Sequence, residues 1–169
     1  MTNALCSMKC SSNVDIDQLS HDVTFSHVKL YKGRPRMLTC RIEPGITLQV
    51  FPRGSVQLLG GNVLNNHMRI YRDVLLPLFN GHLTLPIIET MTVVCYSGRS
   101  FNFSSIMTNA HVMYEVELFP ALQVSLWKPV HMTVFHNGKI ILTGIKDLRQ
   151  VQKMCDLLIE SFPSLISDT

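Results

Sequence analysis

The sequence contains no long apolar run, and this excludes a membrane-spanning helix. No apolar stretch approaches the roughly twenty residues that cross a bilayer. The first residues, MTNALCSMKCSSN, also lack the basic and apolar regions of a signal peptide. We therefore expect a soluble, intracellular protein that has no membrane partner.

Cysteine pairs and catalytic motifs are missing too. The five cysteines form an odd, scattered set without a C-x-x-C pair, so neither a disulfide framework nor a tetrahedral zinc site is indicated. The chain has no P-loop, no G-x-G-x-x-G and no G-x-S-x-G, and its seven histidines form no ligand or base cluster. We expect no enzymatic activity, no cofactor, no metal and no small-molecule substrate, and we assign the cysteines to the core.

Charged residues are sparse, at 16% of the chain, and their balance is weakly basic. A net charge of +3 and a pI near 8.7 permit a polyanionic partner without requiring one, because nucleic-acid-binding domains commonly exceed a pI of about 9. By contrast, 46% of the 169 residues are apolar. This fraction is enough to bury a substantial core, in one domain or in two fused halves.

An internal repeat organises the chain. The repeated elements pair Ile42-Glu43-Pro44 with Trp127-Lys128-Pro129, Phe51-Pro52-Arg53-Gly54 with Phe135-His136-Asn137-Gly138, and Leu58-Leu59-Gly60 with Leu142-Thr143-Gly144. The repeated elements lie 84 residues apart at the two later pairs and 85 residues apart at the proline pair. Such self-similarity indicates one structural unit that occurs twice. We predict that the halves comprise residues 1–85 and 86–169.

Both halves predict the same order of elements. Apolar residues that alternate or run together predict a first strand at 3–9 and its counterpart at 87–96. Four antiparallel strands are expected further along each half, joined by turns such as Asn137-Gly138, which is a strong hairpin signal.

A short helix is expected after the first strand of each half, at 16–21 and at 103–107. The candidate caps are Asn13 or Asp15 for the first helix and Ser100 or Asn102 for the second. Each half then closes on a longer helix, with Pro77 and Pro163 as the expected ends. These helices are predicted by apolar residues three or four apart, namely Leu64, Met68, Tyr71, Leu75 and Leu78, and Leu148, Val151, Cys155, Leu158 and Phe162.

This order predicts an α+β fold in which a curved antiparallel sheet is backed by helices on one face. The other face is expected to be unusually apolar, and we assign to it Val50, Phe51, Val134, Phe135 and Leu142. An apolar face without a helical cover indicates a surface that meets a partner.

Four ordered motifs in the second half resemble the TATA-box-binding protein family. That family carries E-L-F-P-G-L, K-P, F-x-x-G-K and L-T-G-x-K in its second repeat, and here the corresponding residues are Glu117–Leu122, Lys128–Pro129, Phe135–Lys139 and Leu142–Lys146. Several ordered elements are far more specific than one short motif. The resemblance covers essentially the whole chain, with a divergent first repeat. It implies the saddle fold of the family, a ten-stranded sheet whose concave side lies on the minor groove of promoter DNA.

The resemblance also implies which residues act as apolar wedges. Family members insert two pairs of Phe between base steps, and they are themselves the known example of such kinking. Phe119 and Phe135 match the pair of the second repeat, and Phe51 matches one member of the first pair. Arg34 stands at the fourth position, where a cation cannot unstack bases as a ring does, so we expect weaker bending at that end. On periodicity alone, core packing would be the favoured role of each Phe, and it is the resemblance that reverses this preference.

Family members contact bases in the minor groove through four polar side chains, and two of these four are replaced here. The family uses one Asn at the start of each repeat and one Thr before each later Gly. Asn3 and Thr143 occupy one position of each kind, whereas Thr90 replaces the second Asn and Leu59 replaces the first Thr. Because Leu59 can neither donate nor accept a hydrogen bond, we expect a relaxed preference for TATA sequences. Asn3 and Thr143 could also play purely local structural roles.

Cations that could meet DNA phosphates are fewer than in the family. The resemblance assigns this role to Arg53, Lys139 and Lys146. Ser55, Ser125 and Val130 stand where the family usually has Lys or Arg. Each missing phosphate contact lowers the slope of log K against log salt by about one. We therefore expect DNA binding weaker than that of the family.

A second implied function is the recruitment of a protein. Tyr114, Glu115 and Glu117 match the acidic segment, called the stirrup, with which family members receive transcription factor IIB. The resemblance further implies a factor-IIA-like partner and, for a eukaryotic or viral chain, a nuclear location. The first prediction is therefore a transcription initiation factor. Two alternatives stay open: an interaction module that sequesters transcription factors without productive DNA binding, and an enzyme domain with a similar layout.

Overall fold

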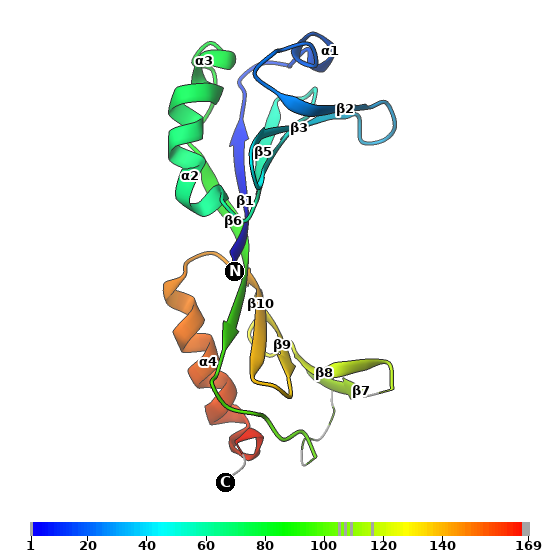
Figure 1. Cartoon of the computed structure of the whole chain (residues 1–169), viewed down its shortest axis with the longest axis vertical. Coiled ribbons are helices and arrows are strands. Elements are labelled where there is room, and N and C mark those ends of the chain that lie inside the picture. The colour runs from blue at the N-terminus through cyan, green and yellow to red at the C-terminus, as the bar shows by residue number, and fades with distance from the viewer. Residues whose placement is uncertain (1, 105, 107, 109, 116, 167–169) are drawn as a thin grey trace. The chain divides into compact units, whose positions relative to one another are not determined.

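The computed structural model describes residues 2–104, 106, 108, 110–115 and 117–166. The chain divides into two compact units, which we call the first unit (2–89) and the second unit (90–169). Each half contributes five strands, and in each the helices cover one face of the strands (Figure 1). No helix among the described residues is long and apolar enough to cross a membrane.

The first unit contains five antiparallel strands in the order β2-β3-β4-β5-β1. The strands are β1 (Thr2–Lys9), β2 (Ser26–Tyr31), β3 (Met37–Glu43), β4 (Ile46–Val50) and β5 (Ser55–Gly60). The prediction of a first strand followed by four antiparallel strands is confirmed in this unit.

The helices of the first unit begin with α1 (Ile16–Leu19), which is two residues shorter than predicted. Asp15 is its cap, because one carboxylate oxygen accepts the backbone N–H groups of Asp17 and Gln18, both at 3.0 Å. The closing helix comprises α2 (Val63–Ile70), the π-helical turn η1 (Tyr71–Leu75) and α3 (Leu76–Leu78). Pro77 lies inside α3, so the helix ends one residue later than expected.

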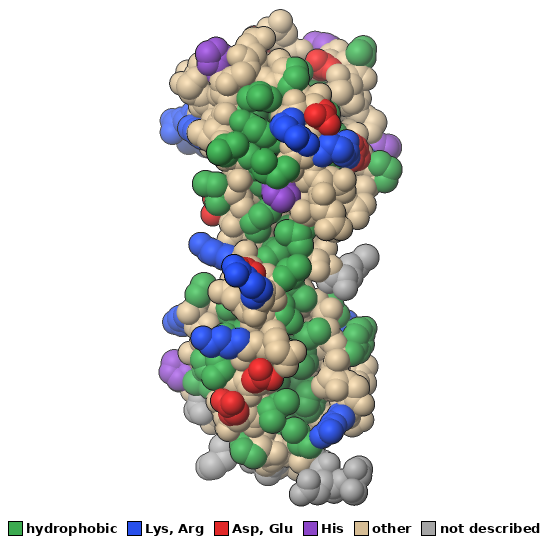
Figure 2. Space-filling model, turned by 90° about the vertical axis from the view of Figure 1, so that its left-hand side faces the viewer, with side chains coloured by type: hydrophobic (Ala, Val, Ile, Leu, Met, Phe, Trp, Pro, Cys, Tyr) green, Lys and Arg blue, Asp and Glu red, His purple; other side chains and the backbone are tan. Residues whose placement is uncertain are grey.

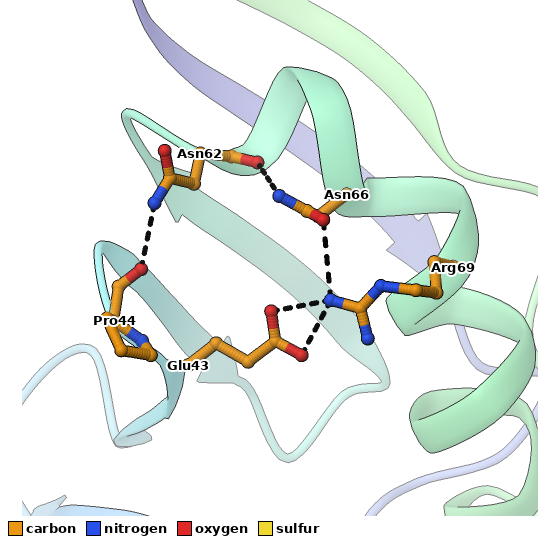
Figure 3. Close-up of polar contacts among 5 residues, drawn as sticks. All are labelled: Glu43, Pro44, Asn62, Asn66 and Arg69. Carbon is orange, nitrogen blue, oxygen red and sulfur yellow. Dashed lines mark hydrogen bonds and ion pairs between the residues drawn. The ribbon is translucent and has the colours of Figure 1, made fainter.

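A polar network fixes α2, from its cap Asn62 to Arg69, against the turn between β3 and β4 (Figure 3). One guanidinium nitrogen of Arg69 donates to both carboxylate oxygens of Glu43, at 2.7 and 2.6 Å. The Asn62 amide donates to the backbone oxygen of Pro44, and the Asn66 amide donates to that of Asn62, each at 3.0 Å. These contacts hold α2 on one face of the strands, so the opposite face of the unit has no helical cover.

The second unit repeats this plan with strands in the order β6-β10-β9-β8-β7. The elements are β6 (Ile87–Tyr96), β7 (Val112–Glu115), β8 (Phe119–Val124), β9 (His131–Phe135), β10 (Lys139–Ile145), α4 (Arg149–Ser161) and the 3-10 turn η2 (Pro163–Leu165). The predicted strand at 87–96 and the closing helix are confirmed. Of the short helix predicted at 103–107, residues 105 and 107 lie outside the described residues, and Ser104 is in a turn.

The exposure of alternate residues corrects one sequence prediction. Val50, Val134 and Leu142 were assigned to the uncovered face, but each is fully buried on the helical side. Successive side chains of a strand point to opposite faces, so Val50 cannot share a face with Phe51. Only the two phenylalanines of that set lie on the face without helices, which we call the open face of each unit.

The pairing register relates each position of the first unit to one position of the second. In the first unit Leu38 pairs with Val50, which in turn pairs with Val56. In the second unit Leu122 pairs with Val134, which in turn pairs with Ile140. Each of these positions in the second unit lies 84 residues after its counterpart in the first (122 after 38, 134 after 50 and 140 after 56), and we call this number the register offset. The hairpin glycines at 54 and 138 fit the register offset too and have the same φ of +82°.

Three of the five cysteines belong to the core, as predicted. Cys6, Cys10 and Cys40 are buried, whereas Cys95 and Cys155 are half-buried, with their sulfur atoms 3.9 Å apart. Among the described residues, no group of three or more His, Cys, Asp or Glu side chains is arranged to hold a metal ion.

Candidate nucleic-acid interface

The open face of the second unit presents a pair of aromatic rings. The Phe119 and Phe135 rings meet edge to face, with centroids 6.1 Å apart and planes at 67°. Phe119 is 40% exposed, and Phe135 is half-buried. The Lys139 ammonium lies 5.2 Å from the centroid of the Phe135 ring, within the range of a cation–π contact. Neither ring is buried under α4, so both can be reached from outside.

Strand pairing explains why these rings come together. Phe119 begins β8, two residues before Ala121, and Ala121 pairs directly with Phe135 on β9. Side chains on one face of neighbouring strands contact each other when they are opposite or diagonal. The small, buried Ala121 side chain leaves room above it for both rings.

Polar candidates lie beside this pair on the same face. Thr143 on β10 pairs with His131 on β9 and is half-buried. Thr90 on β6 is also half-buried and alternates with the buried Met91. Lys146 follows β10 directly and is exposed. Besides the aromatic pair, the second unit therefore offers two hydroxyls and two cations, of which Lys139 lies at the Phe135 ring.

The open face of the first unit has a different chemistry. Asn3 lies on β1 and is exposed. Its neighbour on that face, Leu5, pairs directly with Leu59 on β5. Two aliphatic side chains thus meet on this face, and one of them, Leu59, stands where the second unit has Thr143.

An arginine cleft lies beside the loop between β2 and β3 of the first unit. It has a volume of about 690 Å³, and its lining includes Arg34, Pro35, Arg36, Phe51, Arg53 and Ser55. Arg36 forms an ion pair with Asp17 in which both side chains are about half exposed. No ion pair to Arg34 or Arg53 occurs among the residues that the structure describes.

Lys9 adds a fourth cation at the rim of this cleft. Its ammonium donates to the backbone oxygen of Arg53 at 2.5 Å and lies 3.5 Å from the Ser55 hydroxyl. The sequence motifs did not single out Lys9, because it lies far before the nearest of these arginines in the chain. Only the pairing of β1 with β5 brings it to the cleft.

The register also revises the relation of Arg34 to Phe119. The sequence motifs aligned these two residues at the longer offset of the proline pair, Pro44 with Pro129. The register offset is one residue shorter, and this places Pro35 at the position of Phe119. Arg34 therefore lies one residue further out in the loop between β2 and β3. It still lines the cleft together with Phe51.

Comparisons with known proteins identify the family. The family model described as transcription factor TFIID, or TATA-binding protein (TBP), matches residues 1–76 and 86–164. The chain belongs to the TBP family. This is a family of transcription factors, not of enzymes.

Named relatives and a solved structure agree with this assignment. A TATA-box-binding protein of Archaeoglobus fulgidus is 24% identical over 172 residues, which cover 96% of this chain and 93% of that protein. One from Methanococcus maripaludis is 26% identical over 135 residues, which cover 76% and 75%. The structure of Methanococcus jannaschii TBP matches with a TM-score of 0.78 at 21% identity and 95% coverage of both chains. The fold is the α+β saddle fold of TBP.

The TBP-like stirrup between β7 and β8 does not present its three predicted residues together. Tyr114 packs on the helical side, where its ring lies 5.0 Å from that of Phe103 and its hydroxyl is 3.2 Å from His136 Nε2. Glu115 and Glu117 are exposed. The two carboxylates are therefore free of the aromatic contacts that hold Tyr114.

Glu115 lies on the open face, next to an aromatic wedge. It pairs with Phe119 across the turn, and both line a small hollow of about 210 Å³. Leu118 lines the same hollow and is 80% exposed. The sequence motifs did not single out Leu118 as a binding residue, although E-L-F-P contains it. An exposed leucine beside two carboxylates is a signal that could have marked it.

Ser125 and Val130, two of the positions at which the resemblance predicts a cation, have local structural contacts instead. The Ser125 hydroxyl is 2.9 Å from His131 Nδ1, and Val130 is buried.

Basic, acidic and apolar side chains are interspersed on the helix-bearing side of each unit (Figure 2). The four clustered cations of the arginine cleft lie at the strand side of the first unit.

Proposed function

We propose that this TBP-family protein binds promoter DNA through the minor groove and acts in transcription initiation. The observation that carries the proposal is the edge-to-face pair of Phe119 and Phe135 on the open face of the second unit. A sheet face in contact with water gains nothing by displaying such rings. A base step opened from the minor groove would bury them.

The surrounding groups support the same function. Thr90 and Thr143 can hydrogen-bond to the acceptors that A·T pairs display in the minor groove. Lys139, Lys146 and Arg53 can neutralise phosphates. The hydroxyls are few and the aliphatic groups many, which suits a groove whose hydrogen-bonding pattern is degenerate.

A fluorescence titration of labelled duplexes tests the proposal. Wild-type protein should bind a TATA duplex at low salt, and Phe119→Ala or Phe135→Ala should bind about 10- to 100-fold more weakly, because each loses the burial of one ring. Ile159→Ala is a matched control, since Ile159 is 38% exposed and lies on α4. Binding that is absent at low salt, or equally strong in all variants, would refute the proposal.

We further propose that the stirrup receives a basic protein of the factor-IIB type. Glu115 and Glu117 offer carboxylates for charge-assisted contacts, and the exposed Leu118 offers an apolar anchor between them. Glu115→Lys combined with Glu117→Lys should weaken partner binding at least about tenfold in a pull-down or calorimetric titration. Unchanged binding of a factor-IIB-like protein would defeat this assignment. A factor-IIA-like partner stays a prediction from the resemblance.

A second candidate function is the sequestration of transcription factors without productive DNA binding. Glu115 favours it, because a carboxylate next to the wedge repels phosphate. The aliphatic pair of Leu5 and Leu59 favours it too, since it cannot hydrogen-bond to bases. The duplex titration separates the two functions, because a sequestering protein would bind the partner but not the DNA.

The nuclear location also stays a prediction, and the named relatives are archaeal.

A further inference from the structure

We infer that the two units grip DNA by different chemistry, so that the protein binds an asymmetric site in one orientation. The second unit unstacks a flexible base step with its aromatic pair. The first unit inserts arginines into a narrow minor groove and leaves the bases stacked. This inference rests on the proposed DNA binding and specifies the form of DNA that each unit prefers.

Equivalent positions in the two units show the difference. At the register offset, Phe51 corresponds to Phe135, but Pro35 replaces Phe119. Phe51 therefore has no second ring against it. Met37 replaces the small Ala121, so it fills part of the space that the ring pair uses in the second unit. Lys139, which lies over Phe135, has the uncharged Ser55 as its counterpart.

Charge replaces the missing ring. Arg34 and Arg53 are exposed beside Phe51, and Lys9 is at the rim of the same cleft. Only one acidic partner, Asp17, neutralises a member of this group among the described residues, and it holds Arg36 rather than Arg34 or Arg53. A cleft with at least three uncompensated cations attracts a polyanion more strongly than any single surface lysine could.

The physics of the two surfaces selects different DNA. Pyrimidine–purine steps are easily kinked, which suits a pair of wedges. A-tracts are stiff, and their narrow minor groove has a negative potential that attracts inserted arginine. The preferred duplex is therefore one with a flexible step, such as TA, at one end and an A-tract at the other.

Two 2-aminopurine probes test this inference, because this base brightens when it unstacks. A duplex carries a TA step at both ends, and the probe is placed at one end or the other. A second duplex replaces one TA step by an A-tract. The symmetric duplex can be bound either way round, so we expect wild-type protein at saturation to brighten both of its probes equally but only partially, compared with the TA probe of the mixed duplex. We also expect the mixed duplex to be bound at least as tightly as the symmetric one.

Variants assign each effect to its unit. Phe119→Ala and Phe135→Ala should abolish the brightening. The double variant Arg34→Ala, Arg53→Ala should keep it at saturation but lower the slope of log K against log salt by about two. Arg72→Ala is the matched control, because it removes an exposed cation from the helical η1 turn, and it should leave the slope unchanged.

The outcomes separate this inference from the proposed function. A complete lack of duplex binding would overturn the proposed DNA binding and the inference with it. Binding in which both probes of the symmetric duplex brighten as fully as the TA probe of the mixed duplex would overturn the inference alone. The same holds if Phe51→Ala lowers the brightening of the symmetric duplex as much as Phe119→Ala does.

Discussion

Gly138 occupies a position in the β9–β10 turn where a side chain has no room. Its φ is +82°, and an added Cβ would overlap the backbone oxygen of Arg99 and lie 2.6 Å from the Ser97 hydroxyl. Gly98 has a similar φ of +73°, but an added Cβ there meets no atom within 4 Å. These two glycines therefore share a backbone conformation and differ in steric surroundings.

We predict that Gly138→Ala lowers the free energy of unfolding by about 3 kcal/mol, whereas Gly98→Ala costs only about 1 kcal/mol. The first change adds a steric clash to the conformational cost, and the second adds the conformational cost alone. Chemical denaturation monitored by circular dichroism measures both values. Equal losses for the two variants would mean that the turn relaxes to admit the methyl group.

Two buried thiols of the first unit give stability a dependence on alkaline pH. Burial raises the pKa of Cys6 to about 11 and that of Cys40 to about 12, from 9.0 in an exposed thiol. The folded protein therefore retains these protons where the unfolded chain releases them. The stability that they contribute is fully present below pH 9 and is lost as the pH rises through 11 to 12.

We predict that each thiol lowers the free energy of unfolding by about 1.4 kcal/mol per pH unit above pH 9. Urea unfolding at pH 8, 9 and 10 measures this slope. Cys6→Ala combined with Cys40→Ala should be less stable at pH 8 but should show a flatter decline. An identical decline in the double variant would assign the alkaline loss to other groups.

At the scale of elements, the loop between β2 and β3 decides whether the first unit can act as a wedge. The pairing register places residue 35, not residue 34, at the position of Phe119. A ring at 35 would project beside Phe51 only if the side chain at 37 were as small as Ala121.

We predict that Pro35→Phe combined with Met37→Ala creates a second site of base unstacking, visible as stronger 2-aminopurine brightening of a symmetric duplex than wild-type protein gives at saturation. Arg34→Phe should not do so, because its ring would lie one residue further out. The reverse result, with stronger brightening from Arg34→Phe alone, would show that the bound loop adopts the register of the sequence motifs.

Sequence patterns predicted the strands and the closing helices because alternation and three-to-four spacing depend on neighbouring residues. They misassigned Val50 and Val134, since an apolar residue does not reveal which face of a strand it occupies. They also missed Lys9 and the opposing pair of Leu5 and Leu59, which depend on the pairing of β1 with β5. The one-residue shift at Arg34 was hidden, because the proline in both loops favoured the wrong offset.

At the scale of the whole chain, a net charge of +3 hides two opposite local surfaces. Cations gather in the cleft of the first unit, and carboxylates gather at the stirrup of the second. Composition alone therefore underestimates how strongly each surface selects its partner.

We predict that Glu115→Gln strengthens duplex binding about two- to fivefold at 50 mM salt and has little effect at 1 M salt, because salt screens the repulsion between its carboxylate and the phosphates. Asp156→Gln is a control that removes an exposed carboxylate from α4. A gain of equal size from the control would mean that net charge, and not the place of Glu115, determines the effect.

The position of Glu115 beside Phe119 has a thermodynamic consequence for assembly. A basic protein that neutralises this carboxylate removes a repulsion that opposes the duplex, so its binding should tighten the grip on DNA. Linkage is reciprocal, and bound DNA must then raise the affinity for that protein by the same factor. One side chain would thus make the two binding events cooperative, without any change in the conformation of the chain.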